Sequence, residues 1–310
     1  MLRQPDKATL MENLADAEFL ISERAGVLDL DIIQSAPHLK LIQRLGSLTY
    51  DIDLAAAQAA GVPVCYWPVP GVIRVAEHLV MQILAVGKKL REVETVALAA
   101  SPEWGASQRT TEDIFAYNWS RRVGVNQLWQ RTVGIIGFGE IGVELARRLK
   151  GWDCTLLYNK RRRLPEIAET ELSLTYVGAD ELYAQSDYLV NLLPYFTSTD
   201  MFWDTAVFAK MKTGAYLVSC GSGSTIDESA LAEAIKTGKL AGAALDTYEF
   251  EPIRTDNPLI PLAQAGYNIL LTPHTAAGTE DAGNVGAKRE QEYSNIGHVL
   301  AQRPLQYRII

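Results

Sequence analysis

Short apolar segments alternate with helical patterns along the first third of the chain. Three of these segments, at residues 17–21, 39–42 and 62–65, have the length and composition of strands. Residues 53–60 between the last two follow a helical pattern. Because strands that alternate with helices form parallel sheets, this part predicts an α/β domain.

A second alternation of the same kind begins at Thr132. The pattern predicts strands at 132–136, 154–158, 188–193, 215–218, 240–245 and 268–271, helices at 141–150 and 229–237, and a further helical region after residue 276. The chain therefore has two stretches of αβ alternation. Its 310 residues suit two domains at roughly 100–200 residues each.

Residues 75–130 separate the two alternations. Residues 75–90 are apolar on most faces and predict a long buried helix. The irregular stretch 101–130 carries Trp104, Tyr117 and Trp119 among polar residues. These aromatic residues either pack an arm onto the body, which we favour, or form a contact in an oligomer. A homodimer is expected.

Charge and cysteine content narrow the class of protein. The chain has 37 acidic against 29 basic residues, a net charge of -8, which argues against nucleic acid and anionic membranes as partners. Cys65, Cys154 and Cys220 are far apart, so neither a disulfide framework nor a metal site is expected. Residues 75–86 are too short and too polar to span a bilayer. These features favour a cytoplasmic protein that binds a small molecule.

A glycine-rich motif follows the first strand of the second alternation. Its residues fit G-x-G-x-x-G at the point where a strand meets a helix: Gly137, Phe138, Gly139, Glu140, Ile141 and Gly142. In such motifs the first glycine permits the tight turn and the second lets the backbone approach a pyrophosphate. The third lets the helix pack closely on the strand. The motif predicts a dinucleotide site.

The end of the next strand indicates which dinucleotide is bound. NAD-selective sites place an acidic residue there to bind the ribose 2′-hydroxyl. Here the strand is followed by Asn159, Lys160, Arg161, Arg162 and Arg163. Arginines hold a 2′-phosphate well, so the sequence predicts NADP as cofactor, with NAD as the alternative. Alternatively, these basic residues form a solvated turn and bind no cofactor.

Several motifs, most of them in the second half of the chain, resemble the D-isomer-specific 2-hydroxyacid dehydrogenase family. They occur in the family's order over about residues 15–300 and are the segments 75–78, 225–231, 244–252 and 271–274, together with Pro194 and Thr199 after a strand. The resemblance implies that Pro194 and Thr199 belong to the cofactor site.

The resemblance also implies catalytic roles. His274 matches the histidine that exchanges a proton with the substrate oxygen, and Glu251 matches the acid that hydrogen-bonds this histidine. Asp246 matches the acid near the nicotinamide. The chemistry agrees, because an imidazole beside a carboxylate can discharge an oxygen on which hydride transfer builds charge.

Two substrate-binding elements of the family are altered here. Ser222 stands where the family has its arginine for the substrate carboxylate, and a serine cannot act as a bidentate cation. Leu48 and Thr49 replace part of a glycine-rich turn whose amides usually face the substrate. Arg74, at the start of the long helix, is either a substitute cation or a surface residue. We expect an atypical substrate.

The sequence thus predicts two doubly wound parallel-sheet domains of the α/β class. A Rossmann NAD(P)-binding domain, residues 96–275, is inserted into a flavodoxin-like substrate domain, residues 1–95 and 276–310. The expected function is NAD(P)-dependent hydride transfer between a nicotinamide and a carbonyl or hydroxyl substrate, with His274, Glu251 and Ser222 at the catalytic site. The alternatives are a catalytically silent dinucleotide-binding sensor and a dimeric interaction protein.

Overall fold

A computed structural model describes residues 5–23, 26–278 and 290–310. The chain divides into two compact units, and the second is an insertion in the first. Unit 1 comprises residues 1–73 and 278–310, and unit 2 comprises residues 74–277. The two units are described separately.

Unit 1 contains a small parallel sheet with strand order β1-β2-β3. Its elements are α1 (Lys7–Leu14), β1 (Phe19–Ser22), α2 (Leu30–Gln34), β2 (Leu41–Leu45), α3 (Leu54–Ala59), β3 (Val64–Trp67), η4 (Gln291–Tyr293) and α13 (Ser294–Leu300). The strands follow one another in chain order, so among the described residues this sheet lacks the reversal of a doubly wound one. Asp29 and Asp53 start α2 and α3 by accepting hydrogen bonds from amides in the first turn.

The end of the chain is part of unit 1. The Asn295 side chain on α13 donates to Gln43 Oε1 on β2 at 2.8 Å. The Ile309 amide donates to the Val64 carbonyl at 2.8 Å, which extends the pairing of β3. Segments far apart in the sequence thus complete one unit.

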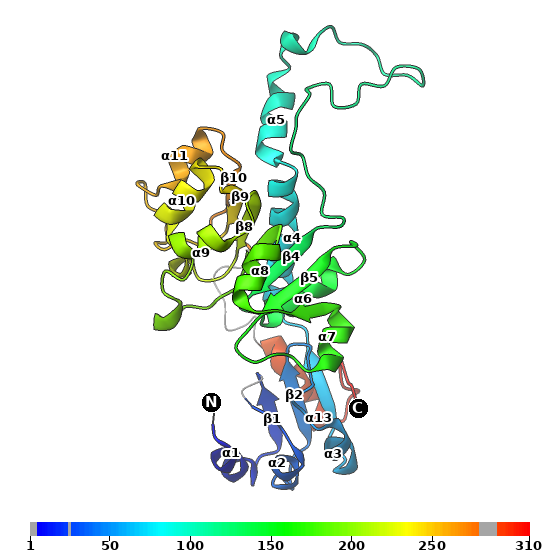
Figure 1. Cartoon of the computed structure of the whole chain (residues 1–310). Coiled ribbons are helices and arrows are strands. Elements are labelled where there is room, and N and C mark those ends of the chain that lie inside the picture. The colour runs from blue at the N-terminus through cyan, green and yellow to red at the C-terminus, as the bar shows by residue number, and fades with distance from the viewer. Residues whose placement is uncertain (1–4, 24–25, 279–289) are drawn as a thin grey trace. The chain divides into compact units, whose positions relative to one another are not determined.

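Unit 2 is built on a seven-stranded parallel sheet with strand order β10-β9-β8-β7-β4-β5-β6 (Figure 1). The strands are β4 (Thr132–Ile136), β5 (Thr155–Asn159), β6 (Leu174–Tyr176), β7 (Tyr188–Asn191), β8 (Ala215–Ser219), β9 (Leu240–Leu245) and β10 (Ile269–Leu271). The order reverses between β4 and β7, as in a Rossmann fold. The predicted α/β class and the Rossmann sheet are confirmed.

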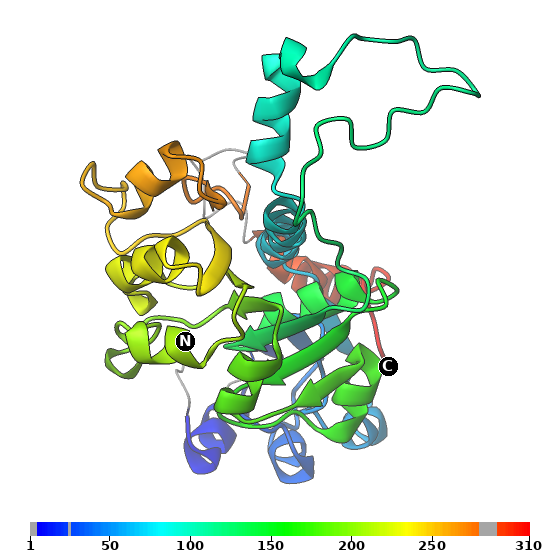
Figure 2. The ribbon, with the colours of Figure 1, turned by 45° about the horizontal axis from the view of Figure 1, so that its top comes forward.

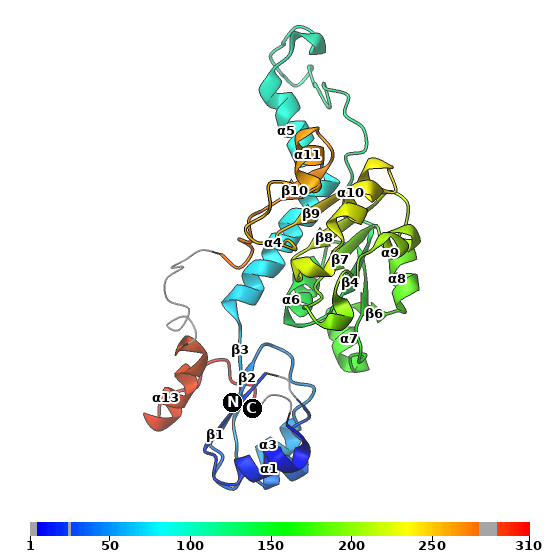
Figure 3. The ribbon, with the colours of Figure 1, turned by 90° about the vertical axis from the view of Figure 1, so that its left-hand side faces the viewer.

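Helices cover both faces of this sheet. The helical elements from residue 70 to residue 264 are α4 (Pro70–Gly87), α5 (Leu90–Ala99), η1 (Pro102–Trp104), α6 (Glu140–Leu149), α7 (Glu166–Leu172), α8 (Ala179–Gln185), η2 (Thr197–Thr199), α9 (Thr205–Lys210), η3 (Gly223–Thr225), α10 (Glu228–Lys236) and α11 (Leu259–Gln264). Figure 3 shows α4 and α6 on one side of the strands and α8, α9 and α10 on the other. The core on the latter side includes the fully buried Trp203 and Phe208.

Helix α4 begins earlier than expected and packs within unit 2. The Val86 carbonyl accepts a hydrogen bond from the Asn268 side chain at 2.9 Å, and the Gly87 carbonyl accepts one from the Asn126 amide at 2.7 Å. The expected boundary at residues 95/96 therefore differs from the division at Ile73/Arg74 that the contacts define. A largely apolar helix buries more surface when it packs along a large sheet.

The length of α4 also changes the conclusion about whether this segment could span a membrane. By length and composition alone it is apolar enough to cross a membrane, whereas the shorter segment 75–86 was expected to be too short and too polar. Core helices have the same length and composition, and 44% of α4 is buried against the rest of the structure.

A long arm follows α4. Lys89 adopts a left-handed backbone, with φ of 50°, between α4 and α5. Helix α5 has no buried residue, and with the irregular segment after it projects beyond the body of unit 2 (Figure 2). Trp104 and Trp119 pack edge to face, and the Arg122 guanidinium lies over the Trp104 ring. The aromatic residues therefore pack partly on one another rather than on the body as expected.

Candidate active site

The glycine motif lies where the sequence predicted it, between β4 and α6. Gly137 has φ of 80°, and a Cβ there would come within 2.6 Å of the Leu192 carbonyl carbon and oxygen. Gly139 precedes the first turn of α6, and a Cβ there would meet only the Gly137 oxygen, at 3.9 Å. The space over Gly139 is therefore open to a ligand. The free amides of the α6 N-terminus face the same region, which suits a pyrophosphate.

The structure requires a glycine at the third position of the motif for a different reason than the one predicted. A Cβ on Gly142 would come within 2.9 Å of the Phe138 ring, which is buried inside the loop itself. Gly142 thus makes room for Phe138 rather than for the strand. The Phe138 ring in turn packs against Tyr158 on β5, so the motif is fixed to its neighbouring strand.

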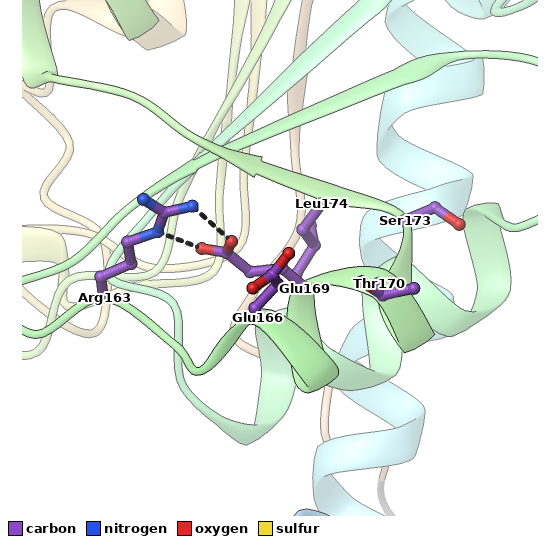
Figure 4. A pocket seen from close by; sticks show the side chains of 6 residues that line it. All are labelled: Arg163, Glu166, Glu169, Thr170, Ser173 and Leu174. Carbon is purple, nitrogen blue, oxygen red and sulfur yellow. Dashed lines mark hydrogen bonds and ion pairs between the residues drawn. The ribbon is translucent and has the colours of Figure 1, made fainter.

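The basic segment after β5 divides into two parts. Arg163 donates two hydrogen bonds to Glu169, from Nε at 2.8 Å and from Nη2 at 2.7 Å (Figure 4). The Tyr158 hydroxyl donates a third at 2.6 Å. Arg163 hydrogen bonding, opposed by burial, lowers the pKa of the Glu169 carboxyl. Arg163 is thus committed to an internal ion pair, on the wall of a pocket along α7.

The other residues of the segment remain near the end of the sheet. Asn159 holds the turn by donating to the Val177 carbonyl at 2.8 Å. The Arg161 guanidinium lies 5.6 Å from the centre of the Phe196 ring, in the loop after β7. Arg162 is exposed. No acidic side chain occurs at residues 159–163, the place where NAD-selective sites carry one.

Pro194 and Thr199 shape the loop after β7. The Thr199 hydroxyl donates to the Pro194 carbonyl at 2.8 Å and accepts a hydrogen bond from the Phe196 amide at 2.8 Å. This loop follows the strand at which the sheet order reverses. Ligands of open α/β sheets bind at that point, beyond the carboxyl ends of the strands.

His274 and Glu251 are in direct contact. Nδ1 of His274 lies 2.7 Å from Oε2 of Glu251, and the other carboxylate oxygen accepts a hydrogen bond from the Tyr248 amide at 3.1 Å. A carboxylate accepts hydrogen bonds, so the Nδ1 atom carries a proton. The Nε2 atom has no hydrogen-bond partner in the described part of the chain, and 59% of the His274 side chain is exposed.

The loop that carries His274 is held in place by the side chain of Asp246, which is 1% exposed. Its Oδ1 accepts hydrogen bonds from the Thr272 hydroxyl at 2.6 Å and the Thr275 amide at 3.0 Å, and its Oδ2 accepts one from the Ala276 amide at 2.9 Å. His274 has a left-handed backbone, with φ of 52°. Asp246 therefore shapes a backbone turn that few non-glycine residues adopt.

His78 on α4 also reaches this loop, which the sequence did not suggest. Its Nε2 atom lies 3.1 Å from the Thr272 hydroxyl and 3.6 Å from Asp246 Oδ1. Burial lowers the pKa of His78, and Asp246 partly opposes this effect. The available signal was the spacing of His78 and Gln82, which are polar and four residues apart on an otherwise apolar helix.

The altered substrate elements fall in both units. Ser222, in unit 2, accepts hydrogen bonds at its carbonyl from Thr225 and donates its amide to Leu193, so it shapes the turn after β8. Leu48 is buried in unit 1, and the Thr49 carbonyl accepts a hydrogen bond from Ile52. In unit 2, Arg74 donates to the Ala277 carbonyl at 3.5 Å.

This sheet, its glycine loop and the His274–Glu251 pair define a dinucleotide-binding protein of the oxidoreductase type. Residues 81–276 match the family described as D-isomer specific 2-hydroxyacid dehydrogenase, NAD binding domain. The chain belongs to the D-isomer specific 2-hydroxyacid dehydrogenase family.

Individual relatives support this assignment. The chain is 32% identical over 297 residues to a D-3-phosphoglycerate dehydrogenase of Archaeoglobus fulgidus, covering 95% of this chain but only 52% of that protein. It is 33% identical to the "Putative 2-hydroxyacid dehydrogenase SERP1888" of Staphylococcus epidermidis, covering 91% and 83% of the two chains. The solved formate dehydrogenase of Granulicella m. aligns with a TM-score of 0.59 at 29% identity, over 96% of this chain and 76% of its own.

Proposed function

We propose that this protein interconverts a carbonyl and a hydroxyl group with His274 as the acid/base. The observation that carries the proposal is the 2.7 Å contact between His274 Nδ1 and Glu251, which leaves Nε2 available. An imidazole oriented through one nitrogen by a carboxylate presents a single, defined nitrogen to a substrate. The exposure of His274 lets a substrate oxygen reach it.

The residues would divide the work as follows. When bound, a nicotinamide dinucleotide supplies or accepts the hydride. His274 gives a proton to the substrate oxygen during reduction and takes it back during oxidation. Glu251 orients the ring through its contact with Nδ1. Asp246 acts as a positioning residue, because its carboxylate holds the amides of Thr275 and Ala276.

We infer that the preferred cofactor is NADP. Lys160, Arg161 and Arg162 follow β5, where an NAD site usually has an acidic residue. Arg163 is excluded from this role because its guanidinium is bound to Glu169. Cofactor binding would use the amides after Gly139 for the pyrophosphate and the cations for the 2′-phosphate.

The substrate is proposed to be atypical for the family. Ser222 offers a hydroxyl in place of a guanidinium, and a carboxylate that enters a closed site loses its water at a cost of several kcal/mol unless a cation replaces it. Arg74 is the candidate substitute. A neutral carbonyl compound avoids the cost altogether and is the substrate class that we favour.

A dimeric interaction protein remains a second candidate, because of the arm. Its exposed apolar residues include Leu98, Phe115, Tyr117 and Val123, each at least 79% exposed. Large apolar residues on a projecting segment are typical of subunit contacts. We propose that two copies associate through the arm, and such a dimer is compatible with catalysis.

The test combines turnover with binding. The full chain is assayed with NADPH and NADH on a panel of 2-keto acids and neutral ketones. We expect His274→Ala to lower turnover about 100-fold while cofactor affinity is retained. Glu251→Gln should lower turnover because the ring loses its carboxylate partner, and His298→Ala serves as the control. Tight cofactor binding without turnover on any substrate would favour the silent sensor instead.

A further inference from the structure

One buried tyrosine contacts the supports of both members of the His274–Glu251 pair. Tyr248 lies in the loop after β9, and its side chain is 6% exposed within the core of unit 2. Its backbone amide donates to Glu251 Oε1 at 3.1 Å, and its hydroxyl donates to the Thr272 carbonyl at 2.9 Å. Thr272 stands just before Pro273 and His274 in the chain. Tyr248 therefore reaches the carboxylate through its amide and the histidine loop through its hydroxyl.

The bond from the Tyr248 amide fixes the direction of the Glu251 carboxylate. Oε1 accepts this amide, and Oε2 is the oxygen that lies 2.7 Å from Nδ1 of His274. A carboxylate that is bound at both oxygens cannot rotate without losing one of the two hydrogen bonds. The backbone of Tyr248 thus determines which oxygen faces the imidazole.

The bond from the Tyr248 hydroxyl fixes the start of the His274 loop. The Thr272 carbonyl accepts this hydroxyl and also, at 3.0 Å, the His274 amide, so both of its lone pairs are used. Burial is the main cause that raises the pKa of the Tyr248 hydroxyl well above its usual range. The hydroxyl therefore keeps its proton at neutral pH and remains a donor. The peptide group between Thr272 and Pro273 is held in one orientation.

Tyr248 is itself held by the turn after β8. A Cβ on Gly223 would overlap the Tyr248 carbonyl group, so the two backbones are in direct contact. Thr247, the preceding residue, donates its hydroxyl to the Gly221 carbonyl at 2.6 Å. The Tyr248 ring belongs to the same buried cluster as Leu245 at the end of β9. Both hydrogen bonds of Tyr248 therefore start from a residue that is fixed at its backbone and at its ring.

We propose that Tyr248 is a positioning residue that fixes the spacing between Glu251 and His274. The inference rests on the proposed function, in which His274 is the acid/base. The two residues are separated by 23 positions in the chain, so their 2.7 Å contact depends on a common support. The hydrogen bonds of Asp246 hold the histidine loop, whereas those of Tyr248 hold both partners.

The expected effect concerns turnover rather than binding. An acid/base group that is displaced by about 1 Å still allows cofactor and substrate to bind, but it transfers its proton less effectively. Loss of the Tyr248 hydroxyl should therefore lower kcat and leave KM and the affinity for the cofactor nearly unchanged.

The first experiment removes this hydroxyl alone. Tyr248→Phe keeps the ring and the amide bond to Glu251 but removes the donor to Thr272. We expect kcat to fall about three- to tenfold, as the loss of one hydrogen bond allows, with an unchanged KM and an unchanged dissociation constant for NADPH. Tyr216→Phe is the matched control, because Tyr216 is also a buried tyrosine of unit 2, and its hydroxyl accepts a hydrogen bond from Asn126. Urea midpoints compare the stability of the two variants.

The second experiment observes the imidazole without any turnover. Nitrogen NMR of the full chain with labelled histidine, at alkaline pH where imidazole is neutral, reports which ring nitrogen carries the proton. The His274 signals are assigned by their absence in His274→Ala. We expect the proton on Nδ1 in the unchanged protein and in Tyr216→Phe, and a mixture of the two tautomers in Tyr248→Phe.

The outcomes separate a positioning role from a structural one. Either a kcat or a tautomer ratio in Tyr248→Phe that equals that of the unchanged protein would overturn the proposal. Equal losses of kcat in Tyr248→Phe and Tyr216→Phe would also overturn it, because a general loss of stability would explain both. An unchanged protein that turns over no substrate would refute the proposed function instead, and the tautomer ratio then decides the role of Tyr248 by itself.

Discussion

The backbone N–H of His274 donates to the carbonyl oxygen of Asp246 at 2.8 Å. The Asp246 side chain binds the next two amides of the same loop, so one buried residue holds three consecutive amides through its carbonyl and its carboxylate. The proposed acid/base is therefore placed by a residue at the end of β9 rather than by its own side-chain contacts alone.

The first prediction concerns the hydrogen bonds by which Asp246 holds the His274 loop. Asp246→Asn places an amide N–H against backbone donors, so one buried hydrogen bond is lost and two donors face each other. We expect the free energy of unfolding to fall by about 1–3 kcal/mol, and turnover to fall because the His274 loop moves. Urea unfolding and steady-state kinetics measure the two effects. Asp200→Asn, on an exposed residue, is the control, and equal losses in both variants would contradict the role of Asp246.

The second prediction concerns the choice of cofactor. Replacing Lys160 and Arg162 together by alanine should weaken NADPH binding by about 30- to 1000-fold, since two charge-assisted hydrogen bonds contribute roughly 2–4 kcal/mol. NADH binding should change little. Lys236→Ala, an exposed lysine on α10, controls for the loss of charge. Equal dissociation constants for NADPH and NADH in the unchanged protein would disprove the preference.

The third prediction concerns the missing substrate arginine. Pyruvate and glyoxylate should be poor substrates, and Ser222→Arg should improve their kcat/KM because a cation replaces the water lost by the carboxylate. If Arg74 already acts as that cation, Arg74→Ala raises KM for acids steeply. If the substrate is neutral, Arg74→Ala has little effect. Efficient turnover of pyruvate that Arg74→Ala leaves unchanged would contradict both versions.

The fourth prediction concerns pH and the Glu169 ion pair. The pKa of Glu169 is lower in the folded protein, chiefly through Arg163. Its charge therefore stabilises the fold above the unfolded value of about 4.3, and this contribution disappears as the pH falls through the lower folded value. Glu169→Gln should reduce the free energy of unfolding at pH 7. In this variant the free energy of unfolding should also decrease less as the pH falls into the acid range. Urea midpoints across this range test it, with Glu94→Gln on α5 as the control.

The regular parts of unit 2 were predictable because each carries a local signal. The motif from Gly137 to Gly142 lies at a strand–helix junction, as expected, because its glycines and the apolar spacing of α6 act over neighbouring residues. Residues 164–186 received no assignment, although they form α7, β6 and α8. These elements are short, and their packing on β5 and β4 decides them more than their own pattern does.

The sequence indicated candidate residues for the site but few of the contacts between them. The His274–Glu251 pair came from a resemblance, and the structure places the two in contact across 23 residues of chain. The Arg163–Glu169 pair was missed, so Arg163 was counted among the cations available to a phosphate. The contacts of His78 could not be predicted, because its partners Thr272 and Asp246 lie more than 160 residues away in sequence. Such long-range contacts leave no periodic pattern.

The pairing of β3 with the end of the chain has a consequence for synthesis of the protein. Val64 leaves the ribosome long before Ile309, which donates to its carbonyl. At about 5–20 residues per second, roughly 240 intervening residues delay that partner by on the order of 10–50 s. Unit 2 is complete in the nascent chain before then. The edge of β3 is therefore without this partner until synthesis is nearly complete, and an unpaired strand edge can pair with other chains during that interval.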